Sequence, residues 1–255
     1  MAELDFDCVA VRYGRQTVVR DVDLTVPSGA IVGLVGESGS GKSTLARAAV
    51  GLAPLAGGRI TLDGADLGRG RSRSRAVQMV FQDPFASLNP RMSIGATVAE
   101  AVPREHRRSR ADLADEVSRL LDLVGLDPAR AGSRPGQLSG GQRQRVAIAR
   151  ALAARPAFVI ADEITSALDV SVQGAILNLI RGLQADLGLG LLFISHNISV
   201  VRYVSDSIVV MRAGEVVESG PAQQVLTSAQ HPYTRELLAT ARESALTTRS
   251  AAESP

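Results

Sequence analysis

Residues 36–44 combine closely spaced glycines with a lysine and hydroxyl side chains. They read Gly36, Glu37, Ser38, Gly39, Ser40, Gly41, Lys42, Ser43 and Thr44. The pattern G-x-x-x-x-G-K-S is typical of a phosphate-binding loop, in which backbone N–H groups turn toward an anion. Lys42 is the only lysine among the 28 Lys and Arg residues. A compact ammonium reaches between two phosphates where a planar guanidinium fits poorly, and the Ser43 hydroxyl is placed to bind Mg²⁺.

The flanks of this loop support the same interpretation. The apolar run Ala30–Val35 precedes it, as a buried strand would, and a helical pattern follows over Leu45–Leu52. A helix that begins near Lys42 adds the positive end of its dipole to the anion site. The alternative is a glycine-rich turn with a chance lysine, and it leaves the strand and the helix unexplained.

A second apolar run ends in two carboxylates. Phe158–Ala161 is followed directly by Asp162 and Glu163. A buried strand of this kind delivers side chains to its carboxyl end, where α/β proteins bind ligands. Asp162 is predicted to hold Mg²⁺, directly or through water, and Glu163 to polarise an attacking water as general base. The alternative is a pair of solvated acids at a strand end.

A second candidate anion site lies later in the chain. Ser139, Gly140, Gly141 and Gln142 follow Leu138 and lead into the basic helical run Arg143–Leu152. Ser139 is a candidate N-cap, and the two glycines expose backbone N–H groups at the helix start. An ordinary capped helix is the alternative for this segment alone. Together with the other motifs, the chain resembles the ATP-binding-cassette ATPases, whose signature is this sequence.

The resemblance assigns roles to three further residues. It implies that Gln82, which follows the strand Ala76–Phe81, contacts Mg²⁺ and the attacking water. It implies that His196, after the strand Leu191–Ser195, touches the γ-phosphate of ATP and stabilises charge there. Tyr13 lies where the family places an aromatic side chain that stacks on adenine.

The resemblance also implies that one chain does not complete the site. In the family, two subunits pair head to tail, and each ATP with its Mg²⁺ lies between Lys42 of one subunit and Ser139 of the other. Ser166–Asp169 matches the segment that links the two sites, with Asp169 among the nucleotide-binding residues. The chain departs from the family pattern at Ile164, where proline is common, and at Asn197 and Ile198, where aspartate and leucine are common.

Two segments resemble one branch of the family, the importers of oligopeptides, dipeptides and nickel. They are Phe81–Met92 and His231–Leu238. A turn-rich loop and a short helix begun by proline are the respective alternatives. The resemblance implies an ATPase subunit that binds two integral-membrane permease subunits, acts indirectly with a solute-binding protein, and lies at the cytoplasmic face of the cell membrane. In this branch one ATPase type often carries a C-terminal cysteine cluster, and this chain, which shows none, resembles the other type. The resemblance implies importers that usually pair two different ATPases, so a heterodimer is expected before a homodimer.

Two other functions compete with import. A non-transport ATPase of the same branch, such as a carbon–phosphorus lyase accessory subunit, differs from an importer subunit only in its partner. A nucleic-acid-associated or ribosome-associated cassette ATPase would need tandem cassettes or a long coiled-coil insertion, and the sequence contains neither. Aromatic residues make up 3% of the chain and the net charge is +2, which disfavours a nucleic-acid partner.

The composition indicates a globular chain that stays outside the bilayer. At 255 residues, 45% of them hydrophobic, the chain is long enough for one large core. No stretch approaches the roughly 20 apolar residues that cross a membrane. Cys8 is the only cysteine, which excludes an internal disulfide or a cysteine-bound metal cluster within this chain. We expect Cys8 to be a small buried strand residue.

The order of elements predicts an α/β fold: a phosphate-binding-loop NTPase core with an antiparallel β subdomain and an inserted α-helical subdomain. We expect a single domain over residues 1–240, with the core at 1–83 and 156–220 and the helical subdomain at 84–155. Short helices follow over 221–242, and a flexible tail over 243–255. Antiparallel strands are expected in Leu4–Val26, and Gly57–Gly58 is expected to lead into a strand at Arg59–Leu62. The other expected elements are helices at Ile94–Val102, Ala111–Val124, Gly141–Ala154 and Val172–Leu187, and a hairpin over Ile208–Ser219.

Overall fold

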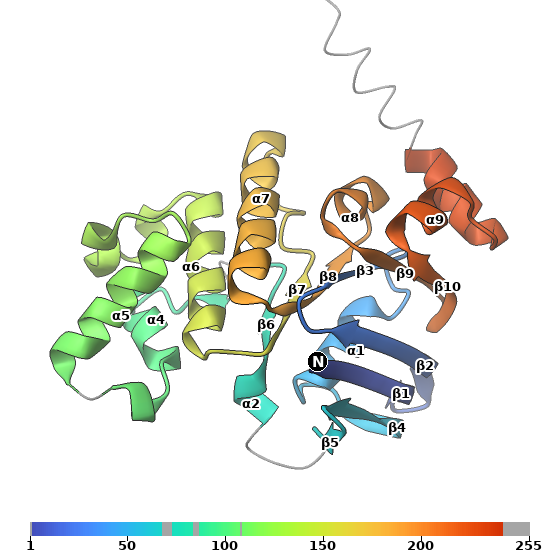
Figure 1. Ribbon diagram of the computed structural model, residues 1–255, viewed down its shortest axis with the longest axis horizontal. Coiled ribbons are helices and arrows are strands. Elements are labelled where there is room, and N and C mark those ends of the chain that lie inside the picture. Colours follow the sequence, from blue (N-terminus) through green and yellow to red (C-terminus); the bar gives the residue numbers. More distant parts are fainter. Residues whose placement is uncertain (1, 68–72, 84–86, 108, 242–255) are drawn as a thin grey trace, which may run out of the picture.

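A small antiparallel sheet occupies one side of the protein (Figure 1). The structure is a computed structural model that describes residues 2–67, 73–83, 87–107 and 109–241. The sheet has four strands in the order β2-β1-β4-β5. Their bounds are Glu3–Tyr13 for β1, Gln16–Pro27 for β2, Leu55–Leu62 for β4 and Ala65–Asp66 for β5. The hairpin of β1 and β2 turns at Gly14, as the sequence predicts.

The second sheet has six strands in the order β10-β9-β3-β8-β7-β6. Its strands are β3 (Ile31–Val35), β6 (Val77–Val80), β7 (Phe158–Asp162), β8 (Gly190–Ser195), β9 (Ser207–Arg212) and β10 (Glu215–Pro221). From β9 to β6 all neighbours are parallel, and β10 joins the edge as the second strand of a hairpin. Every residue of β3, β7 and β8 is buried, which explains their continuous apolar sequences.

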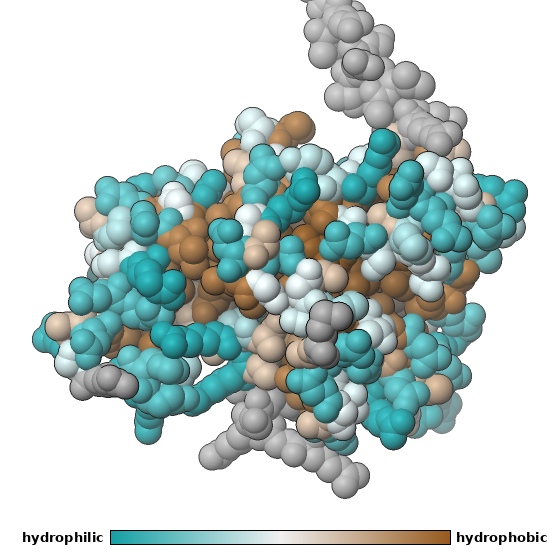
Figure 2. Space-filling view, viewed as in Figure 1, coloured by the Kyte–Doolittle hydropathy of each residue, from teal (hydrophilic) through white to brown (hydrophobic). Residues whose placement is uncertain are grey.

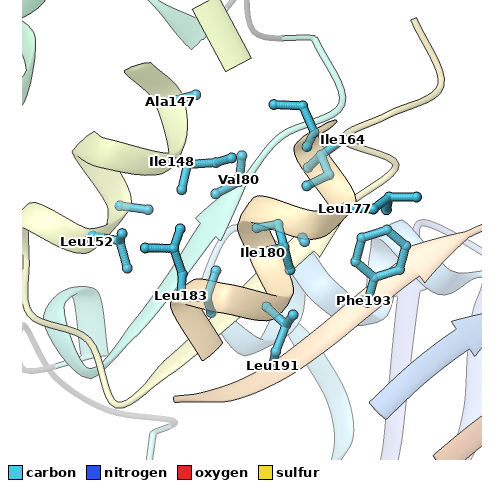
Figure 3. Close-up of a cluster of buried hydrophobic side chains, with 14 of the residues drawn as sticks. Val80, Ala147, Ile148, Leu152, Ile164, Leu177, Ile180, Leu183, Leu191 and Phe193 are labelled. Carbon is cyan, nitrogen blue, oxygen red and sulfur yellow. The ribbon is translucent and has the colours of Figure 1, made fainter. Parts of the chain in front are cut away.

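The two faces of this sheet are covered by different elements. Helix α1 (Lys42–Ala49) packs between one face and the antiparallel sheet, against Val32 and Leu34 of β3. The alternate residues of β3, Ile31 and Val35, point to the opposite face, where helix α7 (Val170–Leu187) packs. Figure 3 shows this second core, in which side chains of α7 meet Phe193 of β8 and apolar residues of the inserted helices.

The inserted helices follow β6 and precede β7. They are α4 (Ile94–Ala101), α5 (Arg110–Leu123) and α6 (Gly140–Ala153), and they form a group beside the sheet in Figure 1. In the same view apolar side chains gather in the middle of the face, over α6 and α7 (Figure 2). A four-residue helix, α2 (Arg73–Ala76), precedes β6. Among the described residues, no helix combines the length and apolarity that crossing a membrane requires.

The expectation that Cys8 is buried was wrong. Cys8 is exposed, with a φ of 46°, because the pairing of β1 with β2 shifts register between Phe6 and Val9. This bulge reverses the inward alternation of the strand. Strand β4 is longer than predicted and contains both Gly57 and Gly58. Gly58 has a φ of 70°, and a Cβ there would lie 2.2 Å from the carbonyl oxygen of Cys8. Glycine at this position lets β4 follow the bulge.

Three helical segments follow β8 in the described chain, one between β8 and β9 and two after β10. Helix α8 (Ile198–Val204) was not predicted, because its run of Val and Ile disfavours a helix in isolation. Asn197 caps it by accepting a hydrogen bond from the N–H of Ser199 at 2.9 Å. Helix α9 (Ala222–Thr227) and a helical segment at 232–241 follow, as expected. The predicted tail at 243–255 lies outside the described residues.

Gly33, in the strand before the phosphate-binding loop, gives a test of this packing. A Cβ at Gly33 would lie 2.2 Å from Cγ1 of Val201 and 2.4 Å from Oγ of Ser205. We expect Gly33→Ala to lower the free energy of unfolding by about 1–3 kcal/mol, because β3 and α8 must separate. Denaturant titration measures this. Gly182→Ala, in α7 with open space around it, is the control and should be neutral or stabilising. Equal stability of both variants would contradict this packing.

Candidate active site

The carboxyl ends of four neighbouring strands meet at one edge of the larger sheet. Val35 of β3 pairs with Ser195 of β8, Ile194 of β8 pairs with Asp162 of β7, and Ala161 of β7 pairs with Val80 of β6. The loops after these strands carry the sequence-predicted groups Lys42, His196, Glu163 and Gln82, respectively. Parallel register therefore brings together residues that are far apart in the sequence.

The loop after β3 has the backbone that anion binding needs. Gly39 and Gly41 have φ values of 82° and 103°, and Gly41 caps the start of α1. These left-handed positions favour glycine and allow the intervening N–H groups to turn inward. Gly36 is required for a different reason, since a Cβ there would lie 2.1 Å from the carbonyl oxygen of Met211 on β9.

Lys42 lies at the centre of this loop. Its side-chain Nζ donates to the carbonyl oxygens of Gly36 at 2.8 Å and Glu37 at 2.7 Å, and to Oγ of Ser40 at 3.2 Å. Lys42 is only 3% exposed, and burial lowers the pKa of its ammonium, although nearby carboxylates oppose this. The three donors of the ammonium are thus held inside the loop, at the position where phosphate oxygens would compete for them.

Ser43 and Asp162 form a pair next to the loop. Oγ of Ser43 donates to Oδ1 of Asp162 at 2.9 Å. Burial raises the pKa of the Asp162 carboxyl, and the Ser43 hydrogen bond partly opposes the shift. A hydroxyl, a carboxylate and the amide oxygen of Gln82 are the hard oxygen donors that Mg²⁺ prefers, so these residues fit the predicted metal.

Glu163 connects the other two predicted groups. Its Oε2 accepts a hydrogen bond from Nε2 of Gln82 at 3.1 Å, and its Oε1 lies 3.3 Å from Nδ1 of His196. Its own backbone has a φ of 48°, and its N–H donates to the carbonyl oxygen of Ile194 at 2.9 Å. The side chain of Glu163 is 15% exposed and that of His196 is 55% exposed, so the carboxylate is mostly covered while the imidazole is open to solvent.

The segment Ser139–Gln142 is a capping box at the start of α6. Oγ of Ser139 accepts from the N–H of Gln142 at 3.3 Å, and Oε1 of Gln142 accepts from the N–H of Ser139 at 3.0 Å. Gly141 also has a packing role that sequence reasoning missed, because a Cβ there would lie 2.5 Å from Cγ1 of Val172 on α7. Ser139 and Gly140 are exposed. Their nucleotide-binding role stays a prediction.

Two predicted residues lie outside these clusters. Tyr13 is 46% exposed at the end of β1, where its ring is open to a stacking ligand. Asp169 is exposed at the start of α7, and the next residue, Val170, is 84% exposed. Their roles also stay predictions. Thr44 continues α1 beyond Ser43 and is half-buried.

One contact of the loop was not foreseen. The hydroxyl oxygen of Tyr233 accepts a hydrogen bond from the N–H of Glu37 at 2.9 Å. The segment His231–Leu238 was interpreted only as a marker of the importer branch. Tyr233 stands between Pro232 and Thr234, and nothing in the sequence indicates where its ring lies.

Comparison with known proteins agrees with this geometry. A family model described as "ABC transporter" matches residues 19–166. The chain belongs to the ABC transporter family. It is 45% identical over 243 residues to a putative peptide import ATP-binding protein of Brucella abortus (strain 2308), with 92% of this chain and 73% of that protein covered. It is 44% identical over 225 residues to the oligopeptide transport ATP-binding protein OppF of Lactococcus lactis (strain IL1403), with coverage of 86% and 70%.

A solved structure extends the comparison to the fold. It is a dimeric, post-hydrolysis state of an ATP-binding cassette bound to ADP and Pi. The two chains superimpose with a TM-score of 0.76 and share 28% sequence identity. The match covers 86% of the present chain and 98% of the chain in the solved structure. The predicted fold class is confirmed, and the activity of the chain is that of an ABC ATPase.

Glu163→Gln tests the general-base prediction. The amide keeps the size of the carboxylate but cannot take a proton, so turnover should fall at least ~10²-fold while ATP still binds. Steady-state ATPase assays and equilibrium nucleotide binding measure the two effects separately, and ATP-bound dimers should accumulate. Near-normal turnover would remove Glu163 from this role.

Lys42 tests the loop. Lys42→Ala should abolish measurable nucleotide binding or hydrolysis, because the ammonium that would contact the phosphates is lost. Lys42→Arg should also be severely impaired, since a planar guanidinium cannot reach all three acceptors inside the loop. Nucleotide titration of both variants, with thermal melting to verify folding, gives the answer. A fully active arginine variant would show that charge alone is sufficient.

Proposed function

We propose that this chain is the ATP-hydrolysing, energy-coupling subunit of an importer, with peptides as the substrate class. The observation that carries the proposal is the convergence of Lys42, Ser43 with Asp162, and Glu163 with Gln82 and His196 at one sheet edge. Positioned charges of this kind suit phosphoryl transfer, which needs orientation and charge stabilisation. The names of the two relatives supply the substrate class.

In the proposed mechanism, Lys42 and the inward N–H groups of its loop hold the β- and γ-phosphates of ATP. Ser43, Asp162 and Gln82 would hold Mg²⁺, which supplies charge neutralisation when bound. Glu163 orients a water and takes its proton as the oxygen attacks the γ-phosphorus. The bond from the γ-phosphorus to the β-phosphate oxygen breaks, ADP carries away the electron pair, and His196 stabilises the charge on the transferred group.

A second ATPase subunit completes each site in this proposal. Ser139 and Gly140 are exposed at the start of α6, and Asp169 and Val170 are exposed at the start of α7. An 84% exposed valine beside an aspartate favours burial against another protein surface. The phosphates of the ATP that the second subunit holds would contact the N–H groups of Gly140 and Gly141 in this chain. We propose that the second subunit is a different ATPase chain. We also propose that the exposed ring of Tyr13 stacks on the adenine of the ATP that this chain binds.

The membrane partner would dock where the inserted helices meet the sheet. A groove of about 330 Å³ lies there, lined by residues that include Leu52, Phe81, Thr97 and Arg150. Leu52 lines this groove and is 61% exposed, so its side chain is available to a partner. A permease helix in this groove would contact both the core and α4, and would hold the chain at the cytoplasmic face of the membrane. The permeases would receive the substrate from a solute-binding protein.

The loop between Gln82 and α4 is attached to α6, the helix that begins at the segment Ser139–Gln142. Nη1 of Arg150, on α6, donates to the carbonyl oxygen of Ser87 at 2.5 Å, and Leu88 beside it is 2% exposed. Closure of the ATP site would therefore move Gln82, this loop and α6 together. Residues 84–86 of the loop after Gln82 lie outside the described residues.

Cross-linking at Leu52 tests the proposed docking. A photoreactive residue at position 52 should capture a permease subunit in native membranes, whereas one at Leu187, an exposed apolar position on α7, should not. The same membranes should take up labelled peptide, and Glu163→Gln should stop uptake. Capture of phosphonate-processing enzymes at position 52 in place of a permease would reject import in favour of the lyase-accessory alternative.

Arg150→Met tests the coupling. Loss of the bond to Ser87 should lower permease-stimulated ATPase activity and transport at least ~10-fold, while ATP affinity stays within ~3-fold, since coupling is lost without the binding groups. Arg155→Met is the matched control. Arg155 follows α6 and pairs at 3.4 Å with Glu116 on α5, away from the loop. Normal transport by the Arg150 variant, or an equal loss in the control, would contradict this role.

A further inference from the structure

The last helical segment contacts the phosphate-binding loop directly. Tyr233, in the segment 232–241, is 2% exposed, and its hydroxyl oxygen accepts from the N–H of Glu37 at 2.9 Å. The two residues are 196 positions apart in the chain. A tyrosine hydroxyl that is buried needs a hydrogen-bond partner, and here that partner is the backbone of the proposed nucleotide site.

The ring of Tyr233 is held in place from several sides. The guanidinium carbon of Arg212, at the end of β9, lies 4.8 Å from the ring centroid. The N–H of Tyr233 donates to Nδ1 of His231 at 3.2 Å. The carboxylate of Glu218 on β10 accepts from the N–H of Gln230 at 2.8 Å and from that of His231 at 3.0 Å. These contacts fix the start of the segment to the β9–β10 hairpin, so the hydroxyl has little freedom to move.

Glu37 transmits this constraint to the loop. Its N–H bonds to Tyr233 and its carbonyl oxygen accepts from Nζ of Lys42 at 2.7 Å. The same carbonyl accepts from the N–H of Ser40 at 3.2 Å. The orientation of the backbone at Glu37 therefore sets one of the three acceptors that hold the Lys42 ammonium. A tyrosine hydroxyl with its ordinary pKa of about 10 is neutral near pH 7, and burial raises the pKa of Tyr233 further.

We propose that Tyr233 is a positioning residue for the phosphate-binding loop, and that docking of the segment 232–241 and nucleotide binding stabilise each other. The inference rests on the proposed function of the loop, and it adds an element that the family model, which ends at residue 166, does not include. Linkage requires the effect to be reciprocal: a docked Tyr233 raises nucleotide affinity, and bound nucleotide holds the segment in place.

Tyr233→Phe tests the role of the hydroxyl in the full chain. Phenylalanine keeps the ring, its burial and its contact with Arg212, and removes only the acceptor of the Glu37 N–H. We expect KM for MgATP to rise ~5–10-fold with kcat changed less than ~2-fold, because the loop holds the phosphates in the ground state and the transition state alike. Tyr203→Phe is the matched control. Tyr203 on α8 lies against an arginine, as Tyr233 does, with Arg181 at 5.4 Å, but its hydroxyl donates to Oδ1 of Asn178 at 2.5 Å and makes no contact with the phosphate-binding loop.

Hydrogen exchange tests the reciprocal effect, that of bound nucleotide on the segment 232–241, in the wild type and in both variants. MgATP should slow amide exchange in 232–241 in the wild type and in Tyr203→Phe, and should fail to do so in Tyr233→Phe. A wild-type KM in Tyr233→Phe, a KM change as large in Tyr203→Phe, or no protection of 232–241 in the wild type would each overturn the proposal. If the wild type itself binds no MgATP, the proposed function fails instead, and if it hydrolyses ATP without transporting peptide, only the substrate class fails.

Discussion

Parallel register across β3, β8, β7 and β6 is the constraint on which the rest of this protein depends. Because the strands run in the same direction and are aligned at their carboxyl ends, four loops meet at one edge. The strands can stay aligned only if both faces of the sheet are covered. Helix α1 and the antiparallel sheet cover one face, and α7 and α8 cover the other. A slip of one residue would exchange these two faces and separate the polar groups.

The polar groups at this edge satisfy one another. The ammonium of Lys42 uses loop carbonyls, Asp162 accepts from Ser43, and Glu163 lies between Gln82 and His196. Burial works against the charged forms of Lys42 and Asp162, since it lowers the first pKa and raises the second. Both groups are therefore harder to keep charged in this site than in water. Bound phosphates would compensate the charge of Lys42, and a bound divalent cation would compensate the charge of Asp162.

Connections beyond the edge make the site part of a larger mechanical unit. Arg150 ties the loop after Gln82 to α6, and Tyr233 ties the phosphate-binding loop to the C-terminal helical segment. Each connection is one hydrogen bond to a backbone group, so each restrains the path of a loop without taking part in chemistry. In the proposed importer, the first connection faces the membrane partner and the second faces away from the inserted helices.

Much of this protein follows from the sequence alone, because local patterns encode local structure. The spacing of Gly36, Gly41 and Lys42 dictates a loop that binds anions, and an apolar run before Asp162 dictates a buried strand that ends in carboxylates. The tertiary structure alone decided other features: the exposure of Cys8 at a bulge, the helix α8 formed from β-branched residues, the packing of Gly141 on Val172, and the bond from Glu37 to Tyr233. These depend on contacts between distant segments, and such contacts leave no periodic pattern in either segment.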